Sequence, residues 1–182
     1  IRRLRDFNTG DNEGVSYFHV NQSHGWRWSN ARAFLAPVRH RRNLRIETGV
    51  LADALIFEGK RATGIRYWQD GRVQEARAKG EVILSAGAIG SPEILQRSGI
   101  GPGEWLSELG IPVRQALAGV GRNLQDHLQL RAMFRVSGVR TLNETYYSPL
   151  GRLLMGAQYA LLRRGPLTMP PSQLGIFTRS DP

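Results

Sequence analysis

The sequence predicts an α/β fold in which a small β-meander lies beside a strand of a parallel sheet. Residues 45–78 form extended segments that are interrupted at Glu58-Gly59 and Asp70-Gly71. The uninterrupted apolar run Val82-Ile83-Leu84 follows, and it is typical of a strand covered on both faces. A turn of small residues and a helix with clear end signals come directly after this strand. Strand, turn and helix in this order indicate half of a nucleotide-binding crossover.

The segments before and within the meander are defined by local signals. Residues 1–30 are polar and aromatic with several glycines, and we expect them to form loop. A short helix is predicted from Ser29 as N-cap to the vicinity of Pro37. Three strands are expected over residues 45–56, 62–68 and 73–78. Asp-Gly between the last two favours a tight hairpin, because both residues tolerate positive φ.

The predicted parallel strand over residues 81–84 ends in small residues. Ser85, Ala86, Gly87 and Ala88 would let a bulky ligand approach the backbone at the sheet edge where open α/β sheets bind ligands. Plain α/β architecture is the alternative explanation. The following helix is predicted to start at Ser91-Pro92 and to close at Gly99.

The last third of the chain predicts an amphipathic helix from Ser148-Pro149 to Gly165, with leucines three and four residues apart. Packing against the body of the protein is the favoured role of its apolar face, and contact with anionic lipid is the alternative. No apolar run approaches the roughly 20 residues that span a bilayer. We therefore expect a cytoplasmic protein, with peripheral contact to the inner membrane as the alternative.

Composition excludes several classes of function. The net charge is +10, but the 25 cationic residues are scattered arginines with only Lys60 and Lys79 as lysines. Scattered charge does not form the coherent patch that nucleic acid binding requires, so no nucleic acid partner is expected. Cysteine is absent, which excludes disulfides, thiolate catalysis and cysteine-ligated zinc.

Residues 87–101, Gly-Ala-Ile-Gly-Ser-Pro-Glu-Ile-Leu-Gln-Arg-Ser-Gly-Ile-Gly, resemble the second sequence signature of the glucose-methanol-choline (GMC) oxidoreductases. Segments 28–35, 48–49, 119–127 and 163–168 are similar, in order, to the corresponding family segments. The resemblance implies an internal fragment of an FAD-dependent protein. Residues 1–128 would be the later part of its Rossmann-like FAD-binding domain, and residues 129–182 the beginning of an α+β substrate domain.

The resemblance also implies roles for individual residues. Ala52 aligns with a backbone contact to adenine, and the turn beneath the cofactor aligns with Ser85, Ala86 and Gly87. Asn123 and Asp126 lie in a segment that resembles the stretch near the flavin ring. The alternative for these two is that they form turns by satisfying local backbone groups.

The implied reaction is hydride transfer from an alcohol to FAD, with electrons passed on to oxygen, a quinone or another acceptor. Choline-oxidising relatives have a glutamate where Gln173 stands, so we expect an uncharged alcohol as substrate. A cyanohydrin-splitting lyase of the same fold and a non-catalytic binding module are the alternatives. None of the four histidines, at positions 19, 24, 40 and 127, occupies the family's catalytic motif. No catalytic residue and no metal site are therefore assigned.

Nothing in the sequence matches the glycine-rich turn that binds the pyrophosphate in full-length members of the family. A helix start of that kind neutralises phosphate charge. We therefore predict that the 182-residue polypeptide alone does not retain FAD. Titration of the isolated chain with FAD, followed by flavin absorbance, checks this. Micromolar affinity with a shifted flavin band would contradict it.

Overall fold

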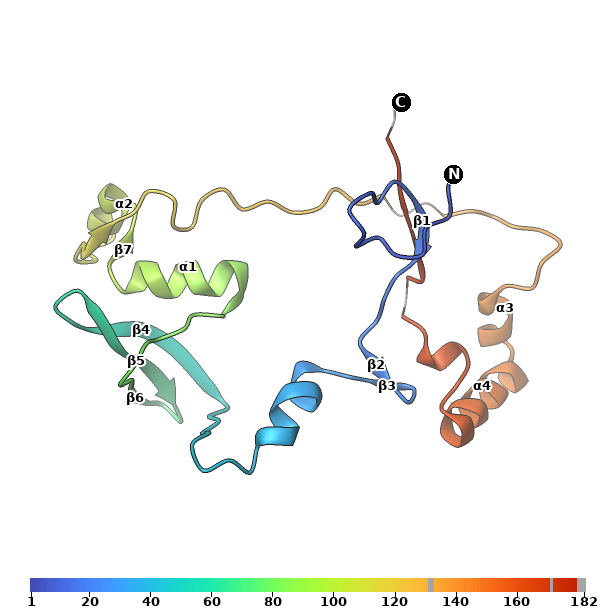
Figure 1. The fold of residues 1–182 in the computed structure, drawn as a ribbon, viewed down its shortest axis with the longest axis horizontal. Coiled ribbons are helices and arrows are strands. Elements are labelled where there is room, and N and C mark those ends of the chain that lie inside the picture. Colours follow the sequence, from blue (N-terminus) through green and yellow to red (C-terminus); the bar gives the residue numbers. More distant parts are fainter. Residues whose placement is uncertain (131–132, 171, 180–182) are drawn as a thin grey trace. The chain divides into compact units, whose positions relative to one another are not determined.

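The computed structural model describes residues 1–130, 133–170 and 172–179. The chain divides into two compact units (Figure 1). One unit combines Ile1–Leu44 with Met133–Pro182, and the other is Arg45–Ala132.

The predicted β-meander is the main sheet of the unit Arg45–Ala132. Strands β4 (Val50–Glu58), β5 (Arg61–Gln69) and β6 (Arg72–Arg77) pair antiparallel in sequence order. Asp70 and Gly71 join β5 to β6, and both have positive φ, at 51° and 73°. This backbone matches the right-handed twist of the two strands. The predicted Asp-Gly hairpin is therefore confirmed.

The prediction of a strand over residues 81–84 is wrong. These residues belong to no strand, and the side chain of Ile83 is 76% exposed. A parallel strand exists only when neighbours supply its ladder hydrogen bonds. Within the described part of the chain no strand pairs with this segment. An apolar run alone does not make a strand, because pairing depends on neighbours that the described residues do not supply.

Helix α1 (Gly87–Arg97) begins four residues before the predicted start, so Pro92 lies inside it. Ser91 was predicted to be the N-cap, but it lies inside the helix. It accepts a hydrogen bond from the backbone N–H of Ala86, at 2.9 Å, and so closes the turn before the helix. The predicted end is confirmed: Gly99 has φ of 81° and donates its N–H to the carbonyl of Gln96.

Three short elements after α1 were not predicted. Strand β7 (Ile100–Gly101) pairs in parallel with β8 (Gln115–Ala116), and helix α2 (Gly103–Glu108) lies between them in sequence. Leu106 of α2 is fully buried. This side chain anchors the segment that follows the signature residues.

In the other unit, residues 1–30, which were expected to form loop, contain three short strands. Strand β1 (Gly14–Tyr17) pairs antiparallel with β9 (Leu174–Phe177), and β2 (Gln22–Ser23) pairs with β3 (Trp26–Arg27). The partner of β1 is far away in the sequence. The local pattern of glycines and polar residues therefore predicted loop and gave no sign of the pairing. This pairing also explains why residues 1–44 form one unit with residues after 132. The predicted domain boundary near Leu128 is a separate expectation and stays a prediction.

The helices of this unit agree in part with expectation. The helix predicted after Ser29 is present as a π-helical turn, η1 (Ala31–Leu35), followed by a 3₁₀ turn, η2 (Ala36–Val38). Helix α4 (Pro149–Leu162) begins as predicted, with the hydroxyl of Ser148 accepting from the N–H of Gly151. It ends at Leu162, three residues before the predicted end at Gly165, because Arg163 takes a left-handed conformation with φ of 53° at the C-cap.

Two further elements of this unit were not predicted. They are α3 (Leu142–Tyr147) and the 3₁₀ turn η3 (Pro166–Thr168). Thr141 caps α3 by accepting from the N–H of Glu144, and Thr-x-x-Glu is a recognisable capping sequence. This signal could have located the helix.

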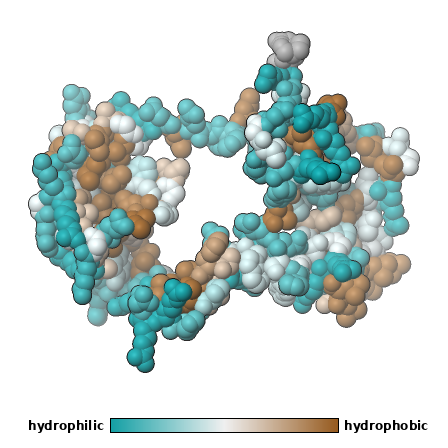
Figure 2. Space-filling model, viewed as in Figure 1, coloured by the Kyte–Doolittle hydropathy of each residue, from teal (hydrophilic) through white to brown (hydrophobic). Residues whose placement is uncertain are grey.

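Exposed leucines gather over α4, where hydrophobic residues are visible on the surface (Figure 2). They are Leu150, Leu153, Leu154, Leu161 and Leu162. Among the described residues, no helix has the length and apolar character needed to cross a membrane.

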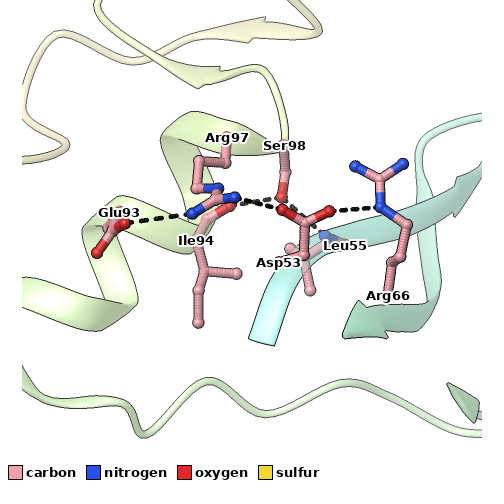
Figure 3. Close-up of polar contacts among 7 residues, drawn as sticks. All are labelled: Asp53, Leu55, Arg66, Glu93, Ile94, Arg97 and Ser98. Atoms are coloured by element: carbon pink, nitrogen blue, oxygen red, sulfur yellow. Dashed lines mark hydrogen bonds and ion pairs between the residues drawn. The ribbon is translucent and has the colours of Figure 1, made fainter. Parts of the chain in front are cut away.

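A buried carboxylate joins the meander to α1 (Figure 3). The register of β4 and β5 shifts between Ala52 and Ala54, which leaves Asp53 as the extra residue of a β-bulge. Its side chain is only 10% exposed. Oxygen Oδ2 accepts from Nε of Arg66 on β5, and Oδ1 accepts from Nη2 of Arg97 at the end of α1, both at 2.5 Å. One carboxylate therefore connects β4, β5 and α1.

A hydroxyl reinforces the same junction. Ser98, directly after α1, accepts from the backbone N–H of Leu55 at 2.8 Å and donates to the carbonyl of Ile94 at 2.5 Å. It thus links β4 to the last turn of the helix. Arg97 also lies 3.4 Å from the carboxylate of Glu93, one turn earlier, in a more exposed contact.

The Asp53 junction makes stability depend on pH. Burial raises the pKa of the Asp53 carboxyl, but hydrogen bonds and charge from Arg66 and Arg97 outweigh burial and hold this pKa below its ordinary value. A carboxyl whose pKa is lowered in the folded state stabilises that state above the unfolded pKa of about 3.9. The stabilisation is lost as pH falls through the lower, folded pKa.

We predict that Asp53→Asn lowers the free energy of unfolding by about 2 kcal/mol at pH 7, because an amide N–H₂ then faces a guanidinium. Urea unfolding followed by tryptophan fluorescence measures this. The difference from wild type should shrink below about pH 4. Glu93→Gln, which removes an exposed carboxylate from the same Arg97, should cost less than about 0.5 kcal/mol. Equal losses in the two variants, or a difference independent of pH, would refute the assignment.

Candidate cofactor-binding site

The turn of small residues at the start of α1 is open. All four residues from Ser85 to Ala88 are exposed, so the turn is not packed against other parts of its unit. Gly87 has φ of 87°, and a Cβ added there would meet no atom within 4 Å. The backbone is therefore accessible to a large ligand, and any side chain at Gly87 would be strained. This cradle fits a bulky cofactor that approaches the main chain closely.

The polar groups of the turn are arranged by the helix. The N–H of Ala86 is occupied by Ser91, while Gly87 and Ala88 begin the helix, where N–H groups have no intrahelical acceptor. The aligned peptide dipoles of α1 place partial positive charge at this end. The turn can therefore receive an electron-rich group of a ligand through its backbone.

Ala52 belongs to the same unit as the turn. It lies on β4 opposite Tyr67, is half-buried, and directly precedes the bulged Asp53. The junction at Asp53 connects the strand carrying Ala52 to the helix that begins with the turn. Both predicted contacts to the cofactor therefore lie on elements joined by direct hydrogen bonds.

Asn123 and Asp126 lie after the signature helix in an exposed stretch. Asn123 has φ of 58°, and a carboxylate oxygen of Asp126 accepts from the N–H of His127 at 2.7 Å. Both features match residues that form turns. Contact of either residue with a flavin ring stays a prediction.

Gln96 was not identified as a site residue from the sequence. Its Nε2 donates to the carbonyl of Val120 at 3.0 Å and holds the turn at residues 119–122 against α1. A Cβ added at Gly121, where φ is 78°, would lie 2.3 Å from this amide nitrogen. Gln96 thereby attaches the segment leading to Asn123 to the same helix as the open turn. The signature contains Gln96, but no spacing rule identifies this contact.

Gln173 belongs to the other unit and is described separately from the residues around α1. It is half-buried, its backbone carbonyl accepts from the N–H of Phe18, and its amide nitrogen lies 2.6 Å from Sδ of Met169. Met169 lines a cavity of about 860 Å³. Its further lining residues include Gln22, Arg27, Trp28, Asn30 and Tyr159. None of the described residues that line it is acidic.

The histidines do not form a catalytic centre. His19, His24, His40 and His127 are all exposed. His19 lies 3.8 Å from Asp6, and Nδ1 of His24 lies 2.9 Å from the hydroxyl of Ser23. In the described ranges no group of three or more His, Asp or Glu side chains is placed to hold a metal ion.

Comparison with known proteins agrees with this geometry. A family model described as GMC oxidoreductase matches residues 2–129. The alcohol dehydrogenase [acceptor] of Pseudomonas putida is 41% identical over 97% of this chain and 32% of its own length. The oxygen-dependent choline dehydrogenase of Chromohalobacter salexigens is 58% identical over 58% of this chain and 19% of its own length. The chain thus spans between about a fifth and a third of these relatives.

Solved structures show the same relationship. An FAD-dependent oxidoreductase from Chaetomium thermophilum has a TM-score of 0.80 and 28% identity, covering 94% of this chain and 31% of that chain. Formate oxidase has a TM-score of 0.80 and 25% identity, covering 99% of this chain and 31% of that chain. The predictions of an α/β fragment of an FAD-binding domain and of FAD as cofactor are confirmed. The chain belongs to the GMC oxidoreductase family.

Proposed function

We propose that this chain provides part of the FAD site of a protein that oxidises the CH–OH group of an alcohol. The single observation that carries the proposal is the open turn at Ser85–Ala88, which lies within the residues matched by the family model. Residues 1–128 belong, in this proposal, to the FAD-binding domain. Residues 129–182 begin the substrate-binding domain.

In this proposal the residues of the chain bind and orient the cofactor and do not react with it. Bound FAD would accept hydride from the alcohol carbon and leave an aldehyde or ketone. Ser85, Ala86 and Gly87 hold the cofactor through close backbone contact, and the backbone at Ala52 contacts the adenine. Asn123 and Asp126 lie near the flavin ring. In this proposal no histidine of the chain is assigned as the base for proton abstraction, because none of the four occupies a position that resembles the family's catalytic motif.

An uncharged alcohol is the proposed substrate. A carboxylate in the binding site is the group that would favour a cationic alcohol over an uncharged one. Gln173 offers an uncharged amide, and the neighbouring cavity has Arg27 but no acidic residue among its described lining. The cation at Arg27 disfavours a second positive charge. The electron acceptor is oxygen, a quinone or another oxidant. The proposed location is the cytoplasm, with peripheral contact with the inner membrane as the alternative.

A bulky residue in the open turn should displace the cofactor. In the full-length protein that carries this sequence, Ala86→Leu should lower FAD affinity by about 10-fold or more, because the backbone of the turn can no longer be approached closely. The ratio of flavin to protein absorbance and equilibrium titration of the apoprotein measure it. Ala76→Leu on the exposed strand β6 is the matched control and should leave FAD affinity unchanged. Unchanged FAD affinity in Ala86→Leu would contradict the proposed site.

Charge at position 173 should govern substrate preference. In the same full-length protein, Gln173→Glu should raise kcat/KM for choline relative to 1-butanol by about 10-fold, because a carboxylate can pair with the quaternary ammonium. Gln115→Glu, an exposed change in the other unit, is the control and should leave the ratio unchanged. A wild-type protein that already prefers choline would overturn the proposal of an uncharged substrate.

A further inference from the structure

The contacts that fix α1 are concentrated at its last turn, away from the open turn at its start. Arg97 is the last residue of the helix and Ser98 follows it. Both bind strand β4, through the carboxylate of Asp53 and through the N–H of Leu55 (Figure 3). Glu81–Leu84, which leads into the open turn, lies in no strand. The far end of the helix therefore determines where the turn lies.

A helix transmits such a constraint as a rigid rod. The 11 residues of α1 give a length of about 16 Å at 1.5 Å per residue. A tilt of roughly 4° about the last turn would move the first turn by about 1 Å. A misplacement of about 1 Å is enough to lower the efficiency of a binding or catalytic arrangement substantially.

We propose that Asp53, acting through Arg97, is a positioning residue that sets the distance between the adenine side of the site on β4 and the open turn on α1. This inference rests on the proposed FAD site. The β-bulge gives it a physical basis, because the extra residue directly follows Ala52 and its carboxylate reaches both Arg66 on the neighbouring strand β5 and Arg97 on the helix. Ser98 supports the same position through a second link.

The two arginines on Asp53 provide a matched test. Each makes one hydrogen bond of 2.5 Å to the same carboxylate, and their side chains are similarly exposed, at 49% for Arg66 and 42% for Arg97. Arg66 lies on β5, within the meander, whereas Arg97 lies on α1. Arg97 has one further contact, 3.4 Å from the exposed carboxylate of Glu93, and such an exposed pair contributes little to stability. A role confined to stability would therefore make the loss of either arginine nearly equivalent. A positioning role makes only Arg97 matter for the cofactor.

The experiment uses the full-length protein and titrates its apo form with FAD. Arg97→Gln should weaken FAD binding by about 10-fold and shift the visible absorbance band of the bound flavin, whereas Arg66→Gln should change affinity by less than about 2-fold. Arg97→Lys, which keeps the charge, should restore part of the affinity. Equal effects of Arg97→Gln and Arg66→Gln on affinity and on the flavin band would overturn the inference.

If Arg97→Gln does not fold, a second pair of variants tests the positioning role. Ser98→Ala removes the link from Leu55 to α1, and Ser107→Ala removes a similar hydroxyl-to-carbonyl bond in α2. Only Ser98→Ala should weaken FAD binding, and equal binding by both variants would overturn the inference. If the wild-type protein itself does not bind FAD, the proposed function fails. If the wild type binds FAD and the variants do not differ, the positioning role alone fails.

Discussion

The carboxylate of Asp53 is the contact on which the arrangement of the signature helix depends. Ile94 of α1 and Ala54 of β4 are buried. Polar contacts from Asp53 and Ser98 add directional links between α1 and β4 to this apolar packing. Burying a carboxylate costs free energy unless hydrogen-bond donors surround it. Arg66 on β5 and Arg97 on α1 donate to Asp53 from two elements. The bulge at Asp53 makes this geometry possible.

Local signals were enough for the features that local chemistry determines. The hairpin at Asp70-Gly71, the end of α1 at Gly99 and the cap of α4 at Ser148 all depend on residues next to one another in sequence. The pairing of β1 with β9 and the absence of pairing at residues 81–84 depend on distant partners, so no local pattern could reveal them. Pro92 suggested a first-turn position, but α1 accommodates it in its interior.

In the candidate site, too, the sequence predicts some features, and others depend on contacts between distant residues. Resemblance to the family located the turn at Ser85–Gly87, and the structure leaves that turn open. The polar contacts that hold it in place, from Asp53, Gln96 and Ser98, arise only when separate elements meet. No spacing in the sequence marks them, because each contact joins residues at least 24 positions apart. The sequence therefore predicts where a cofactor binds, and the structure shows which contacts hold that turn in place.

The open turn and β4 are proposed to face the same bound dinucleotide. Amide hydrogen exchange in the full-length protein, with and without saturating FAD, tests this most directly. FAD should slow exchange at Gly87 and Ala88 and at the amides flanking Ala52, while exchange in the hairpin at Asp70-Gly71 should be unchanged. Unchanged exchange at the turn while FAD is bound would contradict it.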